Sequence, residues 1–245
     1  MDSGTAGGGS RQTGAAEAAA SHSRRGPSKG DLKEQALLAT AEQLLSEKPI
    51  QAIGVDELAR GAGISRPSFY FYFDSKFAVL HALVDRVVRE TYEIASGWLA
   101  DDEAPPEESV RRNIEAVVEQ WRRHGHVLRA AVETWGTVPE MGRYWEAIAA
   151  GFVEAAAAKI TRERRAGAAP AGSPDPRALA TALVWMNERC LYTASIGAPT
   201  SLSRNELVDT LSTIWLRSIY GSYEAISEQP PARASAGARA HLAAG

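Results

Sequence analysis

Apolar residues along this 245-residue chain recur mostly at the three- and four-residue spacing of α-helices. In the segment 55–61, for example, Val55, Leu58 and Ala59 share one face of a short helix. Few segments alternate apolar and polar residues in the way that strands do. The pattern therefore predicts an all-α fold, with helices over residues 31–47, 55–61, 66–73, 75–99, 107–124, 127–134, 139–165, 177–196 and 203–223.

Two of these helices are separated by a very short turn, Ala62-Gly63-Ile64-Ser65. Gly63 is suited to the left-handed conformation that reverses a chain in so few residues. Ser65 is a natural N-cap, and Pro67 fits the first turn of the helix that follows, where its missing N–H costs little. This organisation is typical of a helix-turn-helix, which places its second helix in the major groove of DNA.

Neighbouring segments complete a small bundle around this motif. Asp31 and Glu34 are a capping pair for the helix that precedes it. Phe69 and Phe73 lie at i and i+4 of its second helix, so we expect both rings in the core. A long helix over 75–99 then leads into the rest of the chain.

The composition divides the chain into four parts. Residues 1–30 and 227–245 are low-complexity and are expected to be disordered. Between them, the sequence predicts an N-terminal three-helix helix-turn-helix DNA-binding domain over 31–76 and a C-terminal helical domain over 77–226. The basic run at 24–29 has two interpretations that the sequence does not separate: a solvated tail, or an arm that contacts DNA.

Overall charge gives no sign of nucleic-acid binding, because the net charge is −3. DNA binding would therefore depend on the placement of a few cations. The single cysteine, Cys190, excludes an internal disulfide and fits a reducing cytosol. No apolar run is long enough to span a membrane and no signal peptide is evident, so the sequence predicts a cytoplasmic, nucleoid-associated protein with no membrane partner.

The run from Leu58 to Lys76 resembles the DNA-binding signature of the TetR family of repressors. The runs ATALVWMNERCL over 180–191 and TIWLRSIYG over 213–221 are similar to the EthR-type members of that family. Gly54 and Phe77 depart from the usual signature. The resemblance implies a TetR-like dimeric repressor that binds an operator, is released by a lipophilic small molecule and controls a monooxygenase gene.

Candidate DNA-contacting residues cluster around the second helix of the motif. Arg66 and Pro67 are placed to meet base edges, and an arginine paired with guanine is the commonest specific contact. Ser65, Ser68 and Lys76 suit phosphate oxygens, although Lys76 alternatively reads as a solvated lysine. With the residues that the resemblance adds, the predicted set for double-stranded operator DNA is Ser65, Arg66, Pro67, Ser68, Tyr70, Phe71, Tyr72 and Lys76.

Large aromatic residues are the second candidate constellation, because they come from several helices of the C-terminal half. They would line a ligand pocket or simply pack in the core. Asn187 favours a pocket, since an unpaired amide inside an apolar run would cost about 1–3 kcal/mol. The predicted ligand-binding residues are Val117, Trp121, Trp145, Phe152, Val184, Asn187, Tyr192 and Trp215.

The last two helices, over 177–196 and 203–223, are the predicted homodimer interface, with ordinary core packing as the alternative. No catalytic residue, metal site or cofactor is predicted. His124 and His126 are interpreted as a loop pair without partners, and Cys190 as a packing residue. The rival to a DNA-binding regulator is a helical small-molecule-binding protein or enzyme in which the helix-turn-helix only packs.

Overall fold

The computed structural model describes residues 28–100, 104–172 and 174–221, with the side chains of 94–100 excepted. Within these ranges the chain contains no strand, so the predicted all-α fold is confirmed. The predicted disorder of the two terminal segments concerns residues that lie mostly outside the description. The elements are α2 (Lys29–Glu47), the 3₁₀ turn η1 (Ile50–Ala52), α3 (Val55–Gly61), α4 (Arg66–Phe69), α5 (Lys76–Ala100), α6 (Pro106–Thr134), α7 (Pro139–Ala166), α8 (Pro176–Ser195) and α9 (Arg204–Tyr220).

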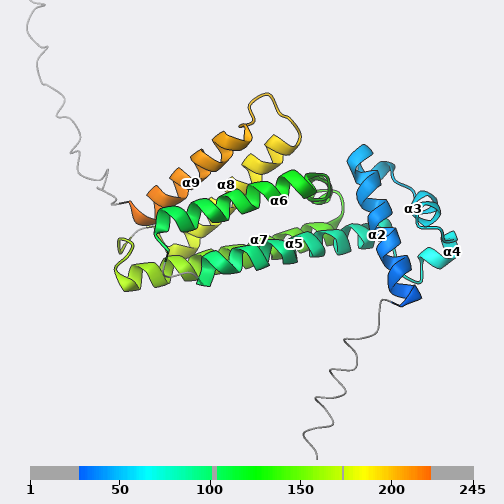
Figure 1. Ribbon diagram of the computed structural model, residues 1–245, viewed down its shortest axis with the longest axis horizontal. Helices are drawn as coiled ribbons and strands as arrows, with labels where there is room; N and C mark the ends of the chain where they lie inside the picture. Colours follow the sequence, from blue (N-terminus) through cyan, green and yellow to red (C-terminus); the bar gives the residue numbers. More distant parts are fainter. Residues whose placement is uncertain (1–27, 101–103, 173, 222–245) are drawn as a thin grey trace, which may run out of the picture.

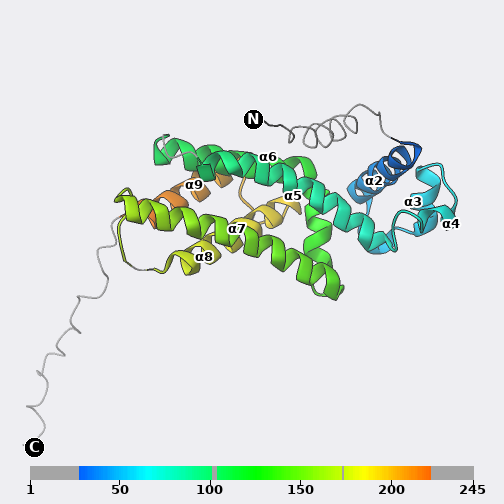
Figure 2. The same cartoon turned by 90° about the horizontal axis from the view of Figure 1, so that it is seen from below.

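The molecule is elongated, and Figure 1 shows α2, α3 and α4 gathered at one end of it. We call these three helices the head and α5 to α9 the body. Figure 2 shows α5 leaving the head and running along the body beside α6 and α7. Among the described ranges, no helix has both the length and the apolar character needed to cross a bilayer.

Helix α2 begins earlier than predicted, because Ser28 and not Asp31 is its N-cap. The Ser28 hydroxyl accepts a hydrogen bond from the Asp31 amide at 3.1 Å, and the Asp31 carboxylate accepts one from the Ser28 amide at 2.8 Å. This reciprocal pair satisfies two backbone donors at once. The predicted Asp31–Glu34 capping pair is therefore wrong.

The head has an apolar core to which each of its helices contributes a buried side chain. Leu37 from α2, Leu58 from α3 and Phe69 from α4 are fully buried, and Phe73 is 8% exposed. The prediction that Phe69 and Phe73 lie in the core is thus confirmed. The same apolar cluster continues into the body through residues such as Leu80 of α5, so the head and the body share one core.

The second helix of the motif is shorter than predicted, since α4 ends at Phe69 and not at residue 73. The Tyr72 amide donates to the Phe69 carbonyl at 2.9 Å, which tightens the last turn. Ser75 then caps α5 by accepting from the Ala78 amide at 3.1 Å. A tight turn lets Phe69 and Phe73 both reach the core before α5 starts.

Helix α6 was predicted as two helices, and the structure joins them across a kink. His124 has non-helical torsion angles there, φ −115° and ψ 17°. Gly125 follows it, and a Cβ at that position would lie 3.6 Å from the Ser195 side chain at the end of α8. The kink therefore marks the point where α6 passes the C-terminal end of α8.

Candidate DNA-reading surface and ligand cavity

The start of α4 is built by the two serines that were predicted to contact phosphates. The Ser65 hydroxyl accepts a hydrogen bond from the Ser68 amide at 3.3 Å and lies 2.8 Å from the Ser68 hydroxyl. Pro67 occupies the first turn of the helix, as predicted. Ser65 is exposed and Ser68 is half-buried, and the phosphate contacts predicted for them remain predictions.

Arg66 projects from the same turn, with 56% of its side chain exposed. Its guanidinium donates to the Asp56 carboxylate of α3 at 2.8 Å. The neighbouring Tyr70 side chain and the Asp56 charge raise the pKa of Arg66 above its already high value. An exposed ion pair of this kind contributes little to stability, so Asp56 is easily exchanged for another hydrogen-bond acceptor.

The three aromatic residues in the turn after α4 differ in solvent exposure. Phe71 is 89% exposed and Tyr70 is 47% exposed. Tyr72, by contrast, is partly buried against the core of the head. Of the three predicted aromatic DNA contacts, Phe71 and Tyr70 thus protrude from the surface, and Tyr72 is the least accessible.

Lys76 has partners within the protein. Its ammonium group donates to the carbonyl oxygens of Gln51 at 2.9 Å and of Ile53 at 3.0 Å. Burial lowers the pKa of Lys76. These bonds tie the start of α5 to the corner that precedes α3, and the phosphate contact predicted for Lys76 remains a prediction.

A cavity of about 140 Å³ lies inside the body, among α5, α6, α7, α8 and α9. Seven of the eight predicted ligand residues line it: Val117, Trp121, Trp145, Phe152, Val184, Asn187 and Trp215. Tyr192 is absent from the lining; its ring packs against the core that joins the head and the body, with the Arg189 guanidinium 5.2 Å from its centre. The helical pattern placed Tyr192 correctly on α8 but could not distinguish the cavity face from the neighbouring face of a helix that is apolar on several sides.

Asn187 does reach the cavity, but half of its amide is engaged. Its side-chain oxygen accepts a hydrogen bond from the indole N–H of Trp215 at 3.0 Å. The amide oxygen has a second lone pair, so the predicted role of Asn187, as an amide that offers a ligand both a donor and an acceptor, stays a prediction. The bond also joins α8 to α9 at the cavity wall.

The long helix α5 forms part of this wall through Val88 and Thr91, which were not predicted. At the next position, the ring of Tyr92 stacks on Phe152 of α7 with centroids 4.4 Å apart. This approach needs the glycine at position 151, because a Cβ there would collide with the Tyr92 hydroxyl. Sequence reasoning treated α5 as a rod leading to the body and missed that its middle lines the cavity.

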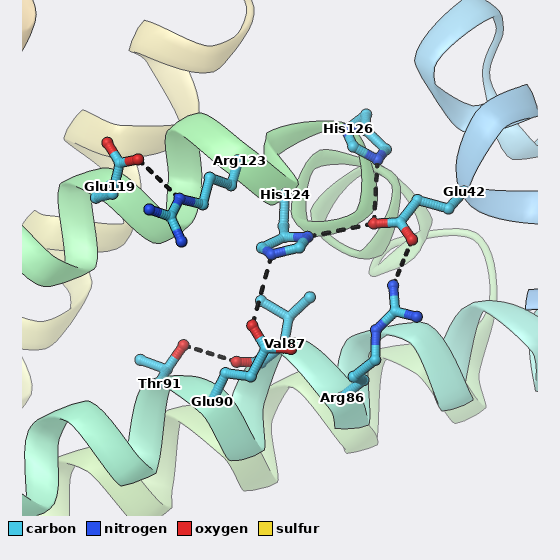
Figure 3. A network of polar contacts seen from close by, with 9 residues as sticks. All are labelled: Glu42, Arg86, Val87, Glu90, Thr91, Glu119, Arg123, His124 and His126. Carbon is cyan, nitrogen blue, oxygen red and sulfur yellow. Dashed lines mark hydrogen bonds and ion pairs between the residues drawn. The ribbon is translucent and has the colours of Figure 1, made fainter. Parts of the chain in front are cut away.

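A polar network joins the head to the body beside the kink in α6 (Figure 3). Glu42 of α2 accepts a hydrogen bond from Arg86 of α5. The same carboxylate lies 3.2 Å from the His124 Nδ1 and 3.7 Å from the His126 Nε2. The His124 Nε2 lies 3.6 Å from the Glu90 carboxylate on α5.

This network overturns the interpretation of the two histidines as a loop pair without partners. The kink in α6 turns both rings toward Glu42, which lies 82 residues before His124 in the sequence. No local pattern reports such a distant pairing. Burial alone would raise the pKa of Glu42, but the hydrogen bonds from Arg86 and His124 lower it overall. Burial lowers the pKa of His126.

Comparison with known proteins decides the family. A family model described as the C-terminal domain of the transcriptional regulator EthR matches residues 110–221, and one described as bacterial regulatory proteins of the tetR family matches residues 37–83. The HTH-type transcriptional regulator EthR of Mycobacterium tuberculosis is 44% identical over 194 residues, which cover 78% of this chain and 89% of that protein. The chain belongs to the TetR family, in its EthR group.

Further relatives agree with this membership. EthR of Mycolicibacterium smegmatis is 41% identical over 193 residues, covering 79% of this chain and 88% of that protein. A TetR-family regulator from Rhodococcus sp. shares the fold with a TM-score of 0.62 at 14% identity, covering 77% of this chain and 98% of that one. FadR of Bacillus halodurans, a fatty acid degradation regulator, shares it with a TM-score of 0.60 at 15% identity, covering 79% and 96%.

Family membership settles the broad function. The chain is a helix-turn-helix transcriptional regulator and not an enzyme, as the sequence predicted. The rival interpretation, a helical binding protein or enzyme without DNA binding, is disfavoured by the same relatives. Within the described ranges, no cluster of histidine, cysteine and acidic side chains is arranged to hold a metal ion.

The histidine network of this TetR-family regulator predicts a loss of stability in mild acid. Because the pKa of His126 is lowered in the folded state, the unfolded chain binds more protons below about pH 6.5. The Tm should therefore fall as the pH decreases from 7 toward 5, and His126→Gln should make that decrease shallower. Thermal unfolding at half-unit pH steps measures both slopes; equal slopes in the two proteins would contradict the assignment.

Proposed function

We propose that this regulator represses transcription by binding operator DNA as a homodimer on the nucleoid, and that a lipophilic small molecule in the body cavity releases it. The two activities have separate sites. The DNA site is the exposed surface of α4 and the turn after it, and the effector site is the cavity among α5 to α9.

The DNA side of the proposal is supported by what the head leaves uncovered. Arg66 and Phe71 protrude within one short segment, and Phe69 between them is fully buried and anchors that segment. A guanidinium suits the guanine edge, and an apolar ring suits the methyl group of thymine.

The dimer side is supported by the outer faces of α8 and α9. Ala178, Thr181 and Ala182 are exposed along α8, and Thr210 and Thr213 are exposed along α9. Small side chains allow two helices to approach closely, so a partner copy would pack four helices together. A twofold pair would then present its two heads to successive major grooves.

The proposed ligand response is supported mainly by helix α5, which contacts both the cavity and the head. Val88 and Thr91 on this helix line the cavity, while Arg86 binds Glu42 of the head. These positions lie within two turns of one rigid element, so a ligand that displaces the cavity wall would also displace the head. Tyr92, stacked on Phe152, adds a second contact that would report cavity filling to α5.

The degree of release depends on the difference in the ligand's binding free energy between the two conformations. An effector shifts the equilibrium only by its preference for the conformation that does not bind DNA. A tenfold bias requires about 1.4 kcal/mol of differential affinity, and near-complete release requires about 5.5 kcal/mol.

Selection of DNA from the source genome tests the proposal. The full chain, immobilised and mixed with sheared genomic DNA, should retain a small set of fragments that share an inverted repeat. The half-sites should lie about one helical turn, or a multiple of it, apart. If the retained fragments include a promoter of a monooxygenase gene, the target implied by the resemblance is identified as well.

A double variant, Arg66→Ala with Phe71→Ala, is the matched control for this selection. It changes only exposed side chains, so it should fold normally and lose the enrichment. Sedimentation of the wild-type protein at micromolar concentration should give a dimer. A monomer, or retained DNA without any common sequence, would argue against operator binding by a symmetric pair.

A further inference from the structure

The cavity contains polar atoms that the protein itself does not satisfy. Four lining residues have a buried side-chain atom with no hydrogen-bond partner in the described parts of the chain. These atoms are Asn113 Oδ1, Gln120 Oε1, Trp145 Nε1 and Glu188 Oε1. Buried polar groups in native proteins are nearly always paired, so the four atoms around this cavity mark positions where a bound molecule would find hydrogen-bond partners.

Two of these residues are deeply buried in spite of their polarity. Gln120 is 6% exposed and Glu188 is 9% exposed. Helix register places them near one another: Gly125 of α6 faces Ser195 of α8, and both helices run toward the head (Figures 1 and 2). Because the two helices run in the same direction, Val118, seven residues before Gly125, lies at the same height along the body as Glu188, seven residues before Ser195. Gln120 is two residues from Val118, so Glu188 and Gln120 lie within one helical turn of each other along the helix axes.

The carboxylate of Glu188 lacks a close cation. The nearest is Arg189, whose Nε lies 3.9 Å from the other carboxylate oxygen. That guanidinium side chain is 58% exposed and also lies over the Tyr192 ring, away from the cavity lining. Burial raises the pKa of Glu188, as expected for a carboxyl that has no strong partner.

The unpaired atoms define the complementary chemistry. Three of the four are oxygens that accept hydrogen bonds, and one of these belongs to a carboxyl group. An ester, a ketone or an ether offers no donor to any of these three. An ammonium group offers three donors and the positive charge that a buried carboxylate needs.

The rest of the lining is apolar. It includes Val88, Ile148, Val184 and Leu191, together with the faces of several aromatic rings. The volume of about 140 Å³ admits a small apolar group, since an engineered cavity of about 150 Å³ holds benzene. The ligand is thus expected to combine a compact hydrocarbon part with one donor-rich end.

We propose that the cavity binds a lipophilic amine, with its ammonium group between Glu188 and Gln120 and its hydrocarbon part against the apolar wall. The inference deepens the proposed function, on which it rests for the regulatory meaning of the ligand.

Three probes of equal size, each a benzene ring with one small substituent, test this proposal: benzylamine, benzyl alcohol and anisole, which is the ether. Binding to the full-length protein is followed by isothermal titration calorimetry, and by the fluorescence of the tryptophans in the cavity wall. The amine should bind at least about tenfold more tightly than the ether, because hydrogen bonds to charged groups are the strong ones. Equal or tighter binding of the ether would overturn the proposal.

Variants assign the preference to the named residues. Glu188→Gln preserves the shape and should abolish the tenfold preference, leaving the Kd for the ether within about twofold. Glu146→Gln, an exposed glutamate on α7, is the matched control and should change none of the three Kd values. If Glu188→Gln does not fold, Gln120→Met should still weaken amine binding severalfold and leave ether binding unchanged. Retention of the full preference in both variants would overturn the assignment.

The same probes separate this inference from the function it rests on. If the amine binds with the expected preference but does not release the selected operator, the ligand site stands and the proposed ligand response fails. If operator binding and the dimer are found but no probe prefers the amine form, the proposed function stands and the amine site is overturned.

Discussion

Replacing Arg66 by alanine is expected to weaken operator binding by about 30-fold to 10⁴-fold. A bidentate arginine–guanine pair contributes about 1–3 kcal/mol of discrimination, and a twofold dimer loses it at both heads. Fluorescence anisotropy with the selected operator and a scrambled duplex measures the change. The scrambled duplex should lose much less affinity, because binding to it depends on phosphates.

A loss of the intramolecular ion pair is the rival explanation, and Asp56→Ala tests it. This substitution removes the same Arg66–Asp56 bond but leaves the guanidinium in place. It also removes a negative charge beside the DNA-facing surface, so affinity for the operator should stay equal or increase. If Asp56→Ala weakened binding as much as Arg66→Ala, the arginine would act through the head and not through DNA.

Replacing Phe69 by alanine is expected to destabilise the head by about 3–5 kcal/mol, the usual range for a fully buried phenylalanine. Its ring contacts Tyr70 edge-on at 5.4 Å between centroids and lies 6.3 Å from Phe73. Hydrogen exchange of the α3 and α4 amides measures the local free energy of opening, which a global melt of a multi-part protein need not report.

Phe71→Ala is the matched control, since it makes the same chemical change two residues away. Phe71 is 89% exposed, so its removal should change the local stability by less than about 0.5 kcal/mol. It should nevertheless weaken operator binding. A large loss of stability from Phe71→Ala, or none from Phe69→Ala, would reverse the assignment of these rings to surface and core.

Local periodicity was enough to predict the course of most helices, and together with the aromatic residues it located seven residues of the cavity wall. The spacing of Phe69 and Phe73 identified the core of the head, and seven of the eight expected ligand residues line one cavity. These features depend on contacts along one helix face, which a sequence displays directly. Helix ends were harder, since the Ser28 cap and the early end of α4 depend on single hydrogen bonds.

Features that join distant segments were not predictable in this way. The partner of His124 is Glu42, and no property of the intervening residues indicates the pairing. The polar atoms of Gln120 and Glu188 were equally hidden, because each residue alone reads as part of a solvated helix face. Asn113, Val117 and Gln120 recur at i, i+4 and i+7 and therefore share one face of α6. Since Val117 was predicted to line the cavity, this spacing could have placed Asn113 and Gln120 in the cavity wall as well.

The continuous core between the head and the first turns of α5 limits how this protein can be recombined with its relatives. Leu80, Leu83 and Val84 are fully buried in the cluster that also holds Leu37 and Leu58. A chimaera joined between α4 and α5 would pair one parent's side chains with the other's at each of these positions. A junction placed after Val87 keeps these α5 contacts within one parent, but Val127 and Ala131 of α6 belong to the same cluster and would have to be matched to the new head.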